Sequence, residues 1–271
     1  MLRLILEDFD AKKIAESGQC FRMTCQDDHT VQVIAFGNVL TIYERGENVW
    51  DFSCTQKEFD TVWKEYFDLD TDYSGYRGLC LPEDAFLKEA LEAGMGIRIL
   101  RQDPWEMLVS FIISQRKSIP AIRTAVELLC TRFGTPFEYD ENQTYYAFPT
   151  PERIAALSEQ ELRDCGLGYR APYVLHAASV FLDTPSLQEY TLSLDELRTA
   201  LMRIHGVGIK VAECVALFGY HHIEAFPVDV WIQRVVQNIY SGTFPAEYQS
   251  AAGVLQQYLF CYARERKLKE Q

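Results

Sequence analysis

A glycine-bracketed turn with a lysine behind it is the part of this sequence best suited to chemistry. Gly206-Val207-Gly208 lies between two helix-like runs, and Lys210 falls in the first turn of the second run. Asp229 follows 19 residues after Lys210, at the start of a third run. A Gly-x-Gly turn between helices exposes backbone N–H groups, and the helix behind it adds a positive dipole. These features predict a site that grips a phosphate beside a reactive amine and a carboxylate.

The surroundings of Lys210 favour a nucleophilic role over that of an ordinary surface lysine. The positive end of a helix dipole disfavours an ammonium group, and the neighbours Ile209, Val211 and Ala212 are apolar. A neutral amine in such a place can form a Schiff base. Asp229 has the position of a helix N-cap, and a rigidly held cap can also serve as a catalytic carboxylate. A plain helix–helix turn and a purely capping aspartate remain the alternatives.

The composition is that of a globular protein with an uneven charge distribution. The chain has 271 residues, 48% of them hydrophobic, and a formal net charge of −13. Residues 1–100 carry 10 basic and 19 acidic residues, whereas residues 201–271 carry 7 and 6. This balance argues against broad affinity for nucleic acid and suits local phosphate gripping near the glycine turn.

Several other classes of protein are disfavoured by the sequence. No apolar run reaches membrane-spanning length, and the acidic N-terminus does not resemble a signal peptide. The eight cysteines include no C-x-x-C pair, so the spacings of zinc and iron–sulfur sites are absent. We therefore expect an intracellular, cytoplasmic monomer that requires no cofactor and has no membrane partner.

The order of the expected elements indicates an α+β fold. Strands are predicted over 30–36, 39–43 and 49–52, with Gly37-Asn38 as a hairpin turn. From about residue 103 onward the pattern is helical, with N-caps at Asp103, Ser158 and Ser193. We expect two domains: an antiparallel sheet with helices over 1–100, and an all-helical region over 101–271 that forms two lobes around a cleft.

Six segments of the chain resemble one family. The runs 206–214 (GVGIKVAEC) and 226–231 (FPVDVW) resemble the helix-hairpin-helix DNA glycosylase superfamily, and the lysine marks its lyase-competent branch. Four further segments are similar to those of 8-oxoguanine DNA glycosylases. They are 17–21 (SGQCF), 101–105 (RQDPW), 166–170 (GLGYR) and 253–260 (GVLQQYLF). The resemblance covers nearly the whole chain and implies a TBP-like N-terminal domain.

The resemblance implies a reaction on duplex DNA that contains 8-oxoguanine. The damaged base is flipped out, Lys210 attacks the sugar carbon and displaces the base, and Asp229 stabilises the developing charge. A Schiff base then forms and β-elimination cuts the strand. The residues that form the base pocket in this family correspond to four positions of this chain. These are Gly18, whose carbonyl would accept the N7–H of the lesion, Cys214 and Phe260, which would sandwich the ring, and Gln256, which would bind its Watson–Crick edge.

The resemblance also implies contacts outside the pocket. Tyr169 would wedge into the base stack, and Arg170 and Arg116 would lie near the opposite base. The DNA backbone phosphates would lie along Gly206, Gly208 and Trp231. The family's hairpin further implies a structural Na⁺ or K⁺ ion held by the backbone carbonyls of Met202, Ile204 and Val207.

The chain departs from the family's pattern where the opposite base is read. The segment 114–118 (SQRKS) stands where an asparagine run is expected, and Ala121 replaces an arginine. Trp231 replaces a histidine near the phosphate. Two other functions remain open: a non-catalytic helix-hairpin-helix DNA-binding module, and a glycosylase of the same fold for alkylated or other damaged bases.

Overall fold

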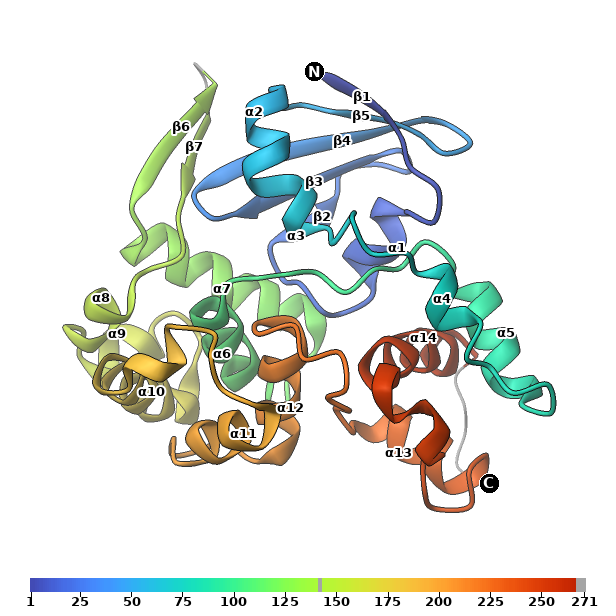
Figure 1. Cartoon of the computed structure of the whole chain (residues 1–271). Coiled ribbons are helices and arrows are strands. Elements are labelled where there is room, and N and C mark those ends of the chain that lie inside the picture. Colours follow the sequence, from blue (N-terminus) through green and yellow to red (C-terminus); the bar gives the residue numbers. More distant parts are fainter. Residues whose placement is uncertain (141–142, 267–271) are drawn as a thin grey trace.

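The N-terminal part of the protein is a five-stranded antiparallel sheet (Figure 1). The computed structural model describes residues 1–140 and 143–266. The strands lie in the order β1-β5-β4-β3-β2. Their bounds are β1 Leu2–Ile5, β2 Met23–Cys25, β3 Thr30–Ala35, β4 Asn38–Gly46 and β5 Val49–Phe52.

One face of this sheet is buried, as the alternation along β3 shows. Val31 and Val33 are buried, whereas the residues beside them are half-exposed. The buried face shares one apolar cluster with α1 (Ala11–Glu16) and with the helix that runs from α2 (Gln56–Glu58) through a π-helical turn to α3 (Lys64–Tyr66). The sheet therefore fixes α1, and with it the turn that follows α1.

The rest of the described chain is mainly helical, which confirms the predicted α+β fold. The helices are α4 Ser74–Arg77, α5 Ala85–Ala93, α6 Pro104–Ser114, α7 Ile119–Phe133, α8 Pro151–Ala155, α9 Glu159–Arg163, α10 Ala171–Asp183, α11 Leu194–Met202, α12 Ile209–Phe218, α13 Val230–Asn238 and α14 Ala252–Glu265. Short 3-10 turns lie at Gly168–Arg170, Pro185–Leu187 and Ala246–Ala251. None of the described helices has the length and apolarity needed to cross a membrane.

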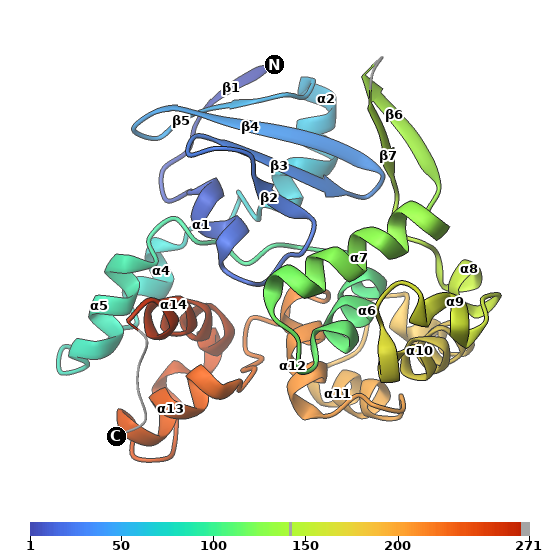
Figure 2. The same cartoon turned by 180° about the vertical axis from the view of Figure 1, so that it is seen from behind.

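The helices form two groups beneath the sheet (Figures 1 and 2). One group contains α6 to α12, and the other contains α13 and α14 together with α4 and α5. Leu87 and Ala90 of α5 lie in the same apolar cluster as Tyr258 of α14. Helices from the first hundred residues thus share a core with the last helix. The domain boundary at residue 100 stays a prediction.

The sequence located the helix starts better than the strands. The predicted N-caps Asp103, Ser158 and Ser193 all cap helices, and the last two form capping boxes. The strands β1 and β2 were missed, as was the hairpin of β6 (Pro136–Asp140) and β7 (Gln143–Tyr146) in a region expected to be helical. These strands are short, and β1 pairs with the distant β5, so local alternation does not reveal them.

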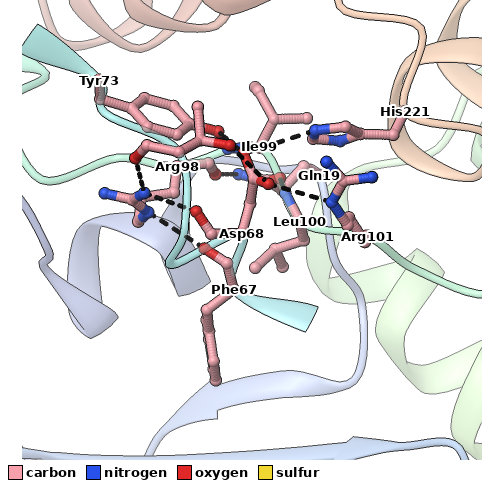
Figure 3. A network of polar contacts seen from close by, with 10 residues as sticks. Gln19, Phe67, Asp68, Tyr73, Arg98, Ile99, Leu100, Arg101 and His221 are labelled. Atoms are coloured by element: carbon pink, nitrogen blue, oxygen red, sulfur yellow. Dashed lines mark hydrogen bonds and ion pairs between the residues drawn. The ribbon is translucent and has the colours of Figure 1, made fainter. Parts of the chain in front are cut away.

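A buried carboxylate, Asp68, joins three parts of the chain (Figure 3). It is 4% exposed, and its oxygens accept hydrogen bonds from Tyr73 Oη at 3.1 Å and Arg101 Nε at 3.0 Å. His221, which follows α12, lies with Nε2 3.4 Å from the same carboxylate. Burial would raise the pKa of Asp68, but the hydrogen bond and charge of His221 and the charge of Arg101 outweigh it, so this pKa lies below its ordinary value.

The side-chain amide of Gln19 binds the backbone of residues 98–101, in the segment that joins α5 to α6 (Figure 3). Its Nε2 donates to the Arg98 carbonyl at 2.9 Å, and its Oε1 accepts from the Leu100 N–H at 2.8 Å. The Arg98 guanidinium in turn donates to the Phe67 and Asp68 carbonyls at 3.1 and 2.6 Å. The turn after α1 and the end of α12 are therefore both anchored to residues 98–101.

We predict that Asp68→Ala lowers the free energy of unfolding by about 2–4 kcal/mol, because it leaves the buried Tyr73 hydroxyl and the largely buried His221 ring without their partner. The Arg101 side chain is 41% exposed, so its guanidinium can be solvated instead. Asp70→Ala is the matched control: Asp70 is 78% exposed and pairs with Lys64, so its loss should cost less than about 1 kcal/mol. Urea denaturation measures both.

The stability lost in Asp68→Ala should be smaller at low pH than at neutral pH. A carboxyl group whose pKa is lowered by folding stabilises the protein above its unfolded pKa and loses that contribution as the pH falls. The difference between wild type and Asp68→Ala should therefore be full at pH 7 and shrink below about pH 4. Equal stabilities of the Asp68→Ala and Asp70→Ala proteins at pH 7 would contradict the role given to Asp68.

Candidate active site

A cavity of about 290 Å³ lies where the two helical groups meet the turn after α1. Its walls come from that turn, from α6 and α7, from α12, and from α13 and α14. All six residues predicted for catalysis and base binding line it. They are Gly18, Lys210, Cys214, Asp229, Gln256 and Phe260.

The glycine turn before α12 sets the position of Lys210. Gly206 has φ +85°, and a Cβ on it would lie 2.3 Å from the ring of Tyr173, so only glycine fits. Gly208 is the N-cap of α12 and is exposed, and no described residue lies within 4 Å of where its Cβ would stand. An anion can therefore approach the backbone closely at Gly208, two residues before Lys210.

Lys210 is half-buried between an aromatic ring and a thiol. Its Nζ lies 5.5 Å from the ring centroid of Phe111 on α6. Cys214, one turn further along α12, is 3% exposed. Burial raises the pKa of the Cys214 thiol to about 11, against a smaller lowering by the charge of Lys210. Cys214 is therefore a neutral, apolar wall of the cavity beside the amine.

Asp229 is both a helix cap and part of the cavity wall. Its Oδ1 accepts from the N–H groups of Trp231 at 3.0 Å and Ile232 at 2.9 Å, which is the predicted N-cap of α13. Burial raises the pKa of Asp229 above its ordinary value, although the Ile232 N–H and the charge of Lys210 act to lower it. The cap leaves the carboxylate rigid, facing the same cavity as the amine.

A network of amides holds the turn that contains Gly18. Gly18 has φ +82°, in the left-handed region that favours glycine. Gln257 Nε2 donates to the Ser17 carbonyl at 2.7 Å, and Gln19 Nε2 donates to Ser17 Oγ at 2.9 Å. A Cβ on Gly18 would lie 3.5 Å from the Phe260 ring, so the turn and this ring are neighbours.

Gln256 presents an unpaired oxygen in a buried position. The side chain is 4% exposed, and its Nε2 donates to the Pro227 carbonyl at 3.0 Å. Its Oε1 is buried and has no hydrogen-bond partner among the described residues. An unpaired buried acceptor is costly, and a ligand with an N–H group would satisfy it.

The predicted DNA-contacting loops lie outside the cavity but are tied to one another. Gln115, in the loop between α6 and α7, donates from Nε2 to the Gly206 carbonyl at 3.0 Å. Its own carbonyl accepts from the Arg170 guanidinium. Tyr169 is 46% exposed and Arg116 is also exposed, at φ +53°. Both side chains therefore present surface to solvent, where a partner could contact them.

Arg170 differs from its predicted neighbours because it is 6% exposed. Its donors bind the carbonyls of Gln115 and Leu167, and its guanidinium lies 4.3 Å from the Tyr169 ring centroid. In this structure Arg170 holds the loop and the turn together. Its contact with the opposite base stays a prediction.

The remaining predicted residues lie around α11 to α13. Trp231 lines the cavity, and the Arg234 guanidinium lies 5.0 Å from its ring centroid.

Of the three carbonyls proposed as cation ligands, that of Ile204 accepts the Val207 N–H at 3.0 Å. Those of Met202 and Val207 accept no hydrogen bond from a described residue, which suits a cation ligand.

Sequence reasoning missed several contributors to the cavity, among them Phe111, Lys117 and Arg264. Phe111 lies in α6, which is buried almost all round, so no pattern distinguishes the side that faces the cavity. Lys117 donates to the Gly166 carbonyl at 2.7 Å. Arg264 could have been found, because it stands four residues after Phe260 on a helix and so shares its face.

Two family models match the chain. The N-terminal domain of 8-oxoguanine DNA glycosylase matches residues 1–108, and the HhH-GPD superfamily of base excision DNA repair proteins matches residues 109–251. The second match covers the hairpin, Lys210 and Asp229.

Relatives and solved structures agree with these models. A probable N-glycosylase/DNA lyase of Methanothermobacter thermautotrophicus is 30% identical over 233 residues, which is 74% of each chain. The structure of MBOgg1 in complex with a low-affinity DNA ligand has a TM-score of 0.90 and 38% identity, and the match covers 97% of this chain and 95% of that one.

The Clostridium acetobutylicum 8-oxoguanine glycosylase/lyase, solved with double-stranded DNA containing cytosine opposite to 8-oxoG, has a TM-score of 0.88. It is 35% identical, and the match covers 96% of this chain and 93% of that one. The chain belongs to the HhH-GPD superfamily of base excision DNA repair proteins, within its 8-oxoguanine DNA glycosylase family.

Proposed function

We propose that this protein is a bifunctional DNA glycosylase and lyase that removes 8-oxoguanine from duplex DNA and cuts the strand. The observation that carries the proposal is the single cavity lined by an amine, a carboxylate and a set of groups that fit a purine. Relatives named N-glycosylase/DNA lyase, and a neighbour solved with DNA containing 8-oxoG, support the same activity.

The cavity can hold an extruded base by stacking and by hydrogen bonds. Cys214 and Phe260 supply two apolar walls for a flat ring. The Gly18 carbonyl takes the N7–H group that 8-oxoguanine has and guanine lacks. The unpaired Oε1 of Gln256 accepts from the Watson–Crick edge, where a guanine carries N–H donors. Binding of the base thus satisfies an acceptor that is otherwise buried without a partner.

The chemistry uses Lys210 and Asp229 in sequence. The amine of Lys210, once deprotonated, attacks the anomeric carbon, and the bond to the base breaks with its electrons going to the base. Asp229, fixed by two backbone N–H groups, stabilises the positive charge that develops on the sugar. The sugar ring opens to a Schiff base, loss of a proton from the adjacent carbon follows, and the 3′ phosphate leaves by β-elimination.

The surface around the cavity grips the duplex. The N–H groups of the turn from Gly206 to Gly208 bind a phosphate at the start of α12, where the backbone is open at Gly208. Trp231 packs beside the sugar–phosphate backbone. A Na⁺ or K⁺ ion held by the carbonyls of Met202, Ile204 and Val207 would add positive charge next to that phosphate. Tyr169, exposed at its turn, fills the gap left by the extruded base.

Lys210→Gln should fold and bind a lesion duplex but lose both base release and the adduct trapped by borohydride, because only an amine forms the Schiff base. Gel analysis of trapping on an 8-oxoguanine duplex measures this. Lys117→Gln, which removes the other lysine amine identified at this cavity, is the matched control and should keep the adduct. A trapped adduct with Lys210→Gln would refute the assignment.

Asp229→Asn should keep the cap, because asparagine and aspartate are equivalent at this position, so the melting temperature should barely change. Single-turnover base excision should nevertheless fall by about a hundredfold or more, since the charge that stabilises the transition state is lost. A fall in activity no larger than the loss of stability explains would mean that Asp229 is only a cap.

Discrimination of the opposite base should be relaxed. Ala121 lacks the donor expected there, and Arg170 is buried with its donors on backbone carbonyls, which leaves Arg116 as the exposed donor. A well-made bidentate contact is worth about 1–3 kcal/mol of discrimination, so one remaining donor gives only a modest preference.

Single-turnover excision from four duplexes that differ only in the opposite base tests this expectation. We expect removal opposite cytosine and appreciable removal opposite other bases. A preference for cytosine of about a hundredfold or more over each other base would contradict it and would assign the readout to Arg116 or Arg170.

A further inference from the structure

Arg264 lines the base cavity but has no part in the recognition described above. It stands on α14, one turn after Phe260, and its guanidinium lies 5.2 Å from the centroid of the Phe260 ring. Arg264 is half-buried, so its charge is partly removed from solvent. A cation in this place needs a partner, and the cavity is the open space beside it.

The guanidinium is anchored on one side only. Its Nη2 donates to the Glu16 carbonyl at 2.7 Å, which ties α14 to the turn that contains Gly18. Its Nη1 lies 3.8 Å from the position that a Cβ on Gly18 would occupy. Apart from the bond to Glu16, the guanidinium donates no hydrogen bond to a described residue. A fixed guanidinium thus keeps unused N–H donors next to Gly18.

This arrangement matches the atoms that distinguish the lesion from guanine. In 8-oxoguanine the N7–H donor and the O8 acceptor are neighbours, whereas guanine has a bare N7 and a C8–H. The Gly18 carbonyl is an acceptor, and Arg264 supplies donors beside it. We propose that Arg264 donates a hydrogen bond to O8 of the extruded base, so that Gly18 and Arg264 together read the N7–H/O8 pair; this inference rests on the proposed function.

The second contact adds selectivity that the Gly18 carbonyl alone does not supply. With 8-oxoguanine in the cavity, the charged donor has an acceptor. With guanine it would face a C–H group while losing water, and an unpaired buried donor is costly. Sites that hydrogen-bond a substrate group reject analogues that lack it more strongly than apolar pockets do.

The test measures affinity in the Lys210→Gln background, where no chemistry follows binding. Duplexes carrying 8-oxoguanine, guanine or 8-thioguanine are compared by fluorescence anisotropy. The thio analogue keeps N7–H but replaces O8 with sulfur, a weaker acceptor. Arg264→Leu removes the donors while keeping apolar contact with Phe260. Arg266→Leu is the matched control, because it removes the same charge from an arginine that is 62% exposed and pairs with Glu89.

Arg264→Leu should lower the preference for 8-oxoguanine over guanine by about tenfold or more, and it should shrink the preference for 8-oxoguanine over 8-thioguanine. Arg266→Leu should leave both ratios unchanged. If Arg264→Leu weakens the 8-oxoguanine and 8-thioguanine duplexes equally, Arg264 only supports the Gly18 turn and the proposal is wrong. Unchanged ratios with Arg264→Leu would also overturn it.

The same titrations separate this inference from the proposed function. Equal binding of 8-oxoguanine and guanine duplexes by the Lys210→Gln protein itself would contradict both. A clear preference in that protein which survives Arg264→Leu would contradict only the contact with O8. Thermal unfolding of each variant establishes that a lost preference does not arise from loss of the fold.

Discussion

The arrangement of this protein depends on the polar anchorage of residues 98–101, in the segment that joins α5 to α6. Asp68 binds this segment and the histidine that follows α12, while Gln19 binds it from the turn that follows α1. Because α12 carries Lys210 and the turn carries Gly18, the two halves of the cavity are positioned by the same buried contacts. Such buried polar groups fix a geometry at the expense of desolvation, so their loss is costly.

Features governed by local backbone chemistry could be predicted from the sequence. The turn at Gly206 needs a left-handed backbone and leaves no room for a side chain, and the cap at Asp229 needs a short acceptor. Both are visible as residue types at fixed spacing. The resemblance then supplied the four base-pocket positions, and all of them line one cavity with Lys210 and Asp229.

Features that depend on contacts between distant segments could not be read in this way. The strand β1 is defined by its pairing with β5, and Phe111 faces the cavity from a helix that is buried almost all round. Arg170 looks like an exposed recognition residue in its motif, yet its guanidinium binds backbone carbonyls of two loops. The side chains that connect segments, such as Gln115, carry no pattern of their own in the sequence.

The central claim is that the cavity between α12 and α14 receives an extruded 8-oxoguanine. The most direct test is a crystal structure of the Lys210→Gln protein with a duplex that carries this lesion. The account predicts the base between Cys214 and Phe260, with N7 within hydrogen-bonding distance of the Gly18 carbonyl and the Watson–Crick edge at Gln256. A lesion that remains stacked in the duplex, or that enters with its N7 edge away from Gly18, would contradict it.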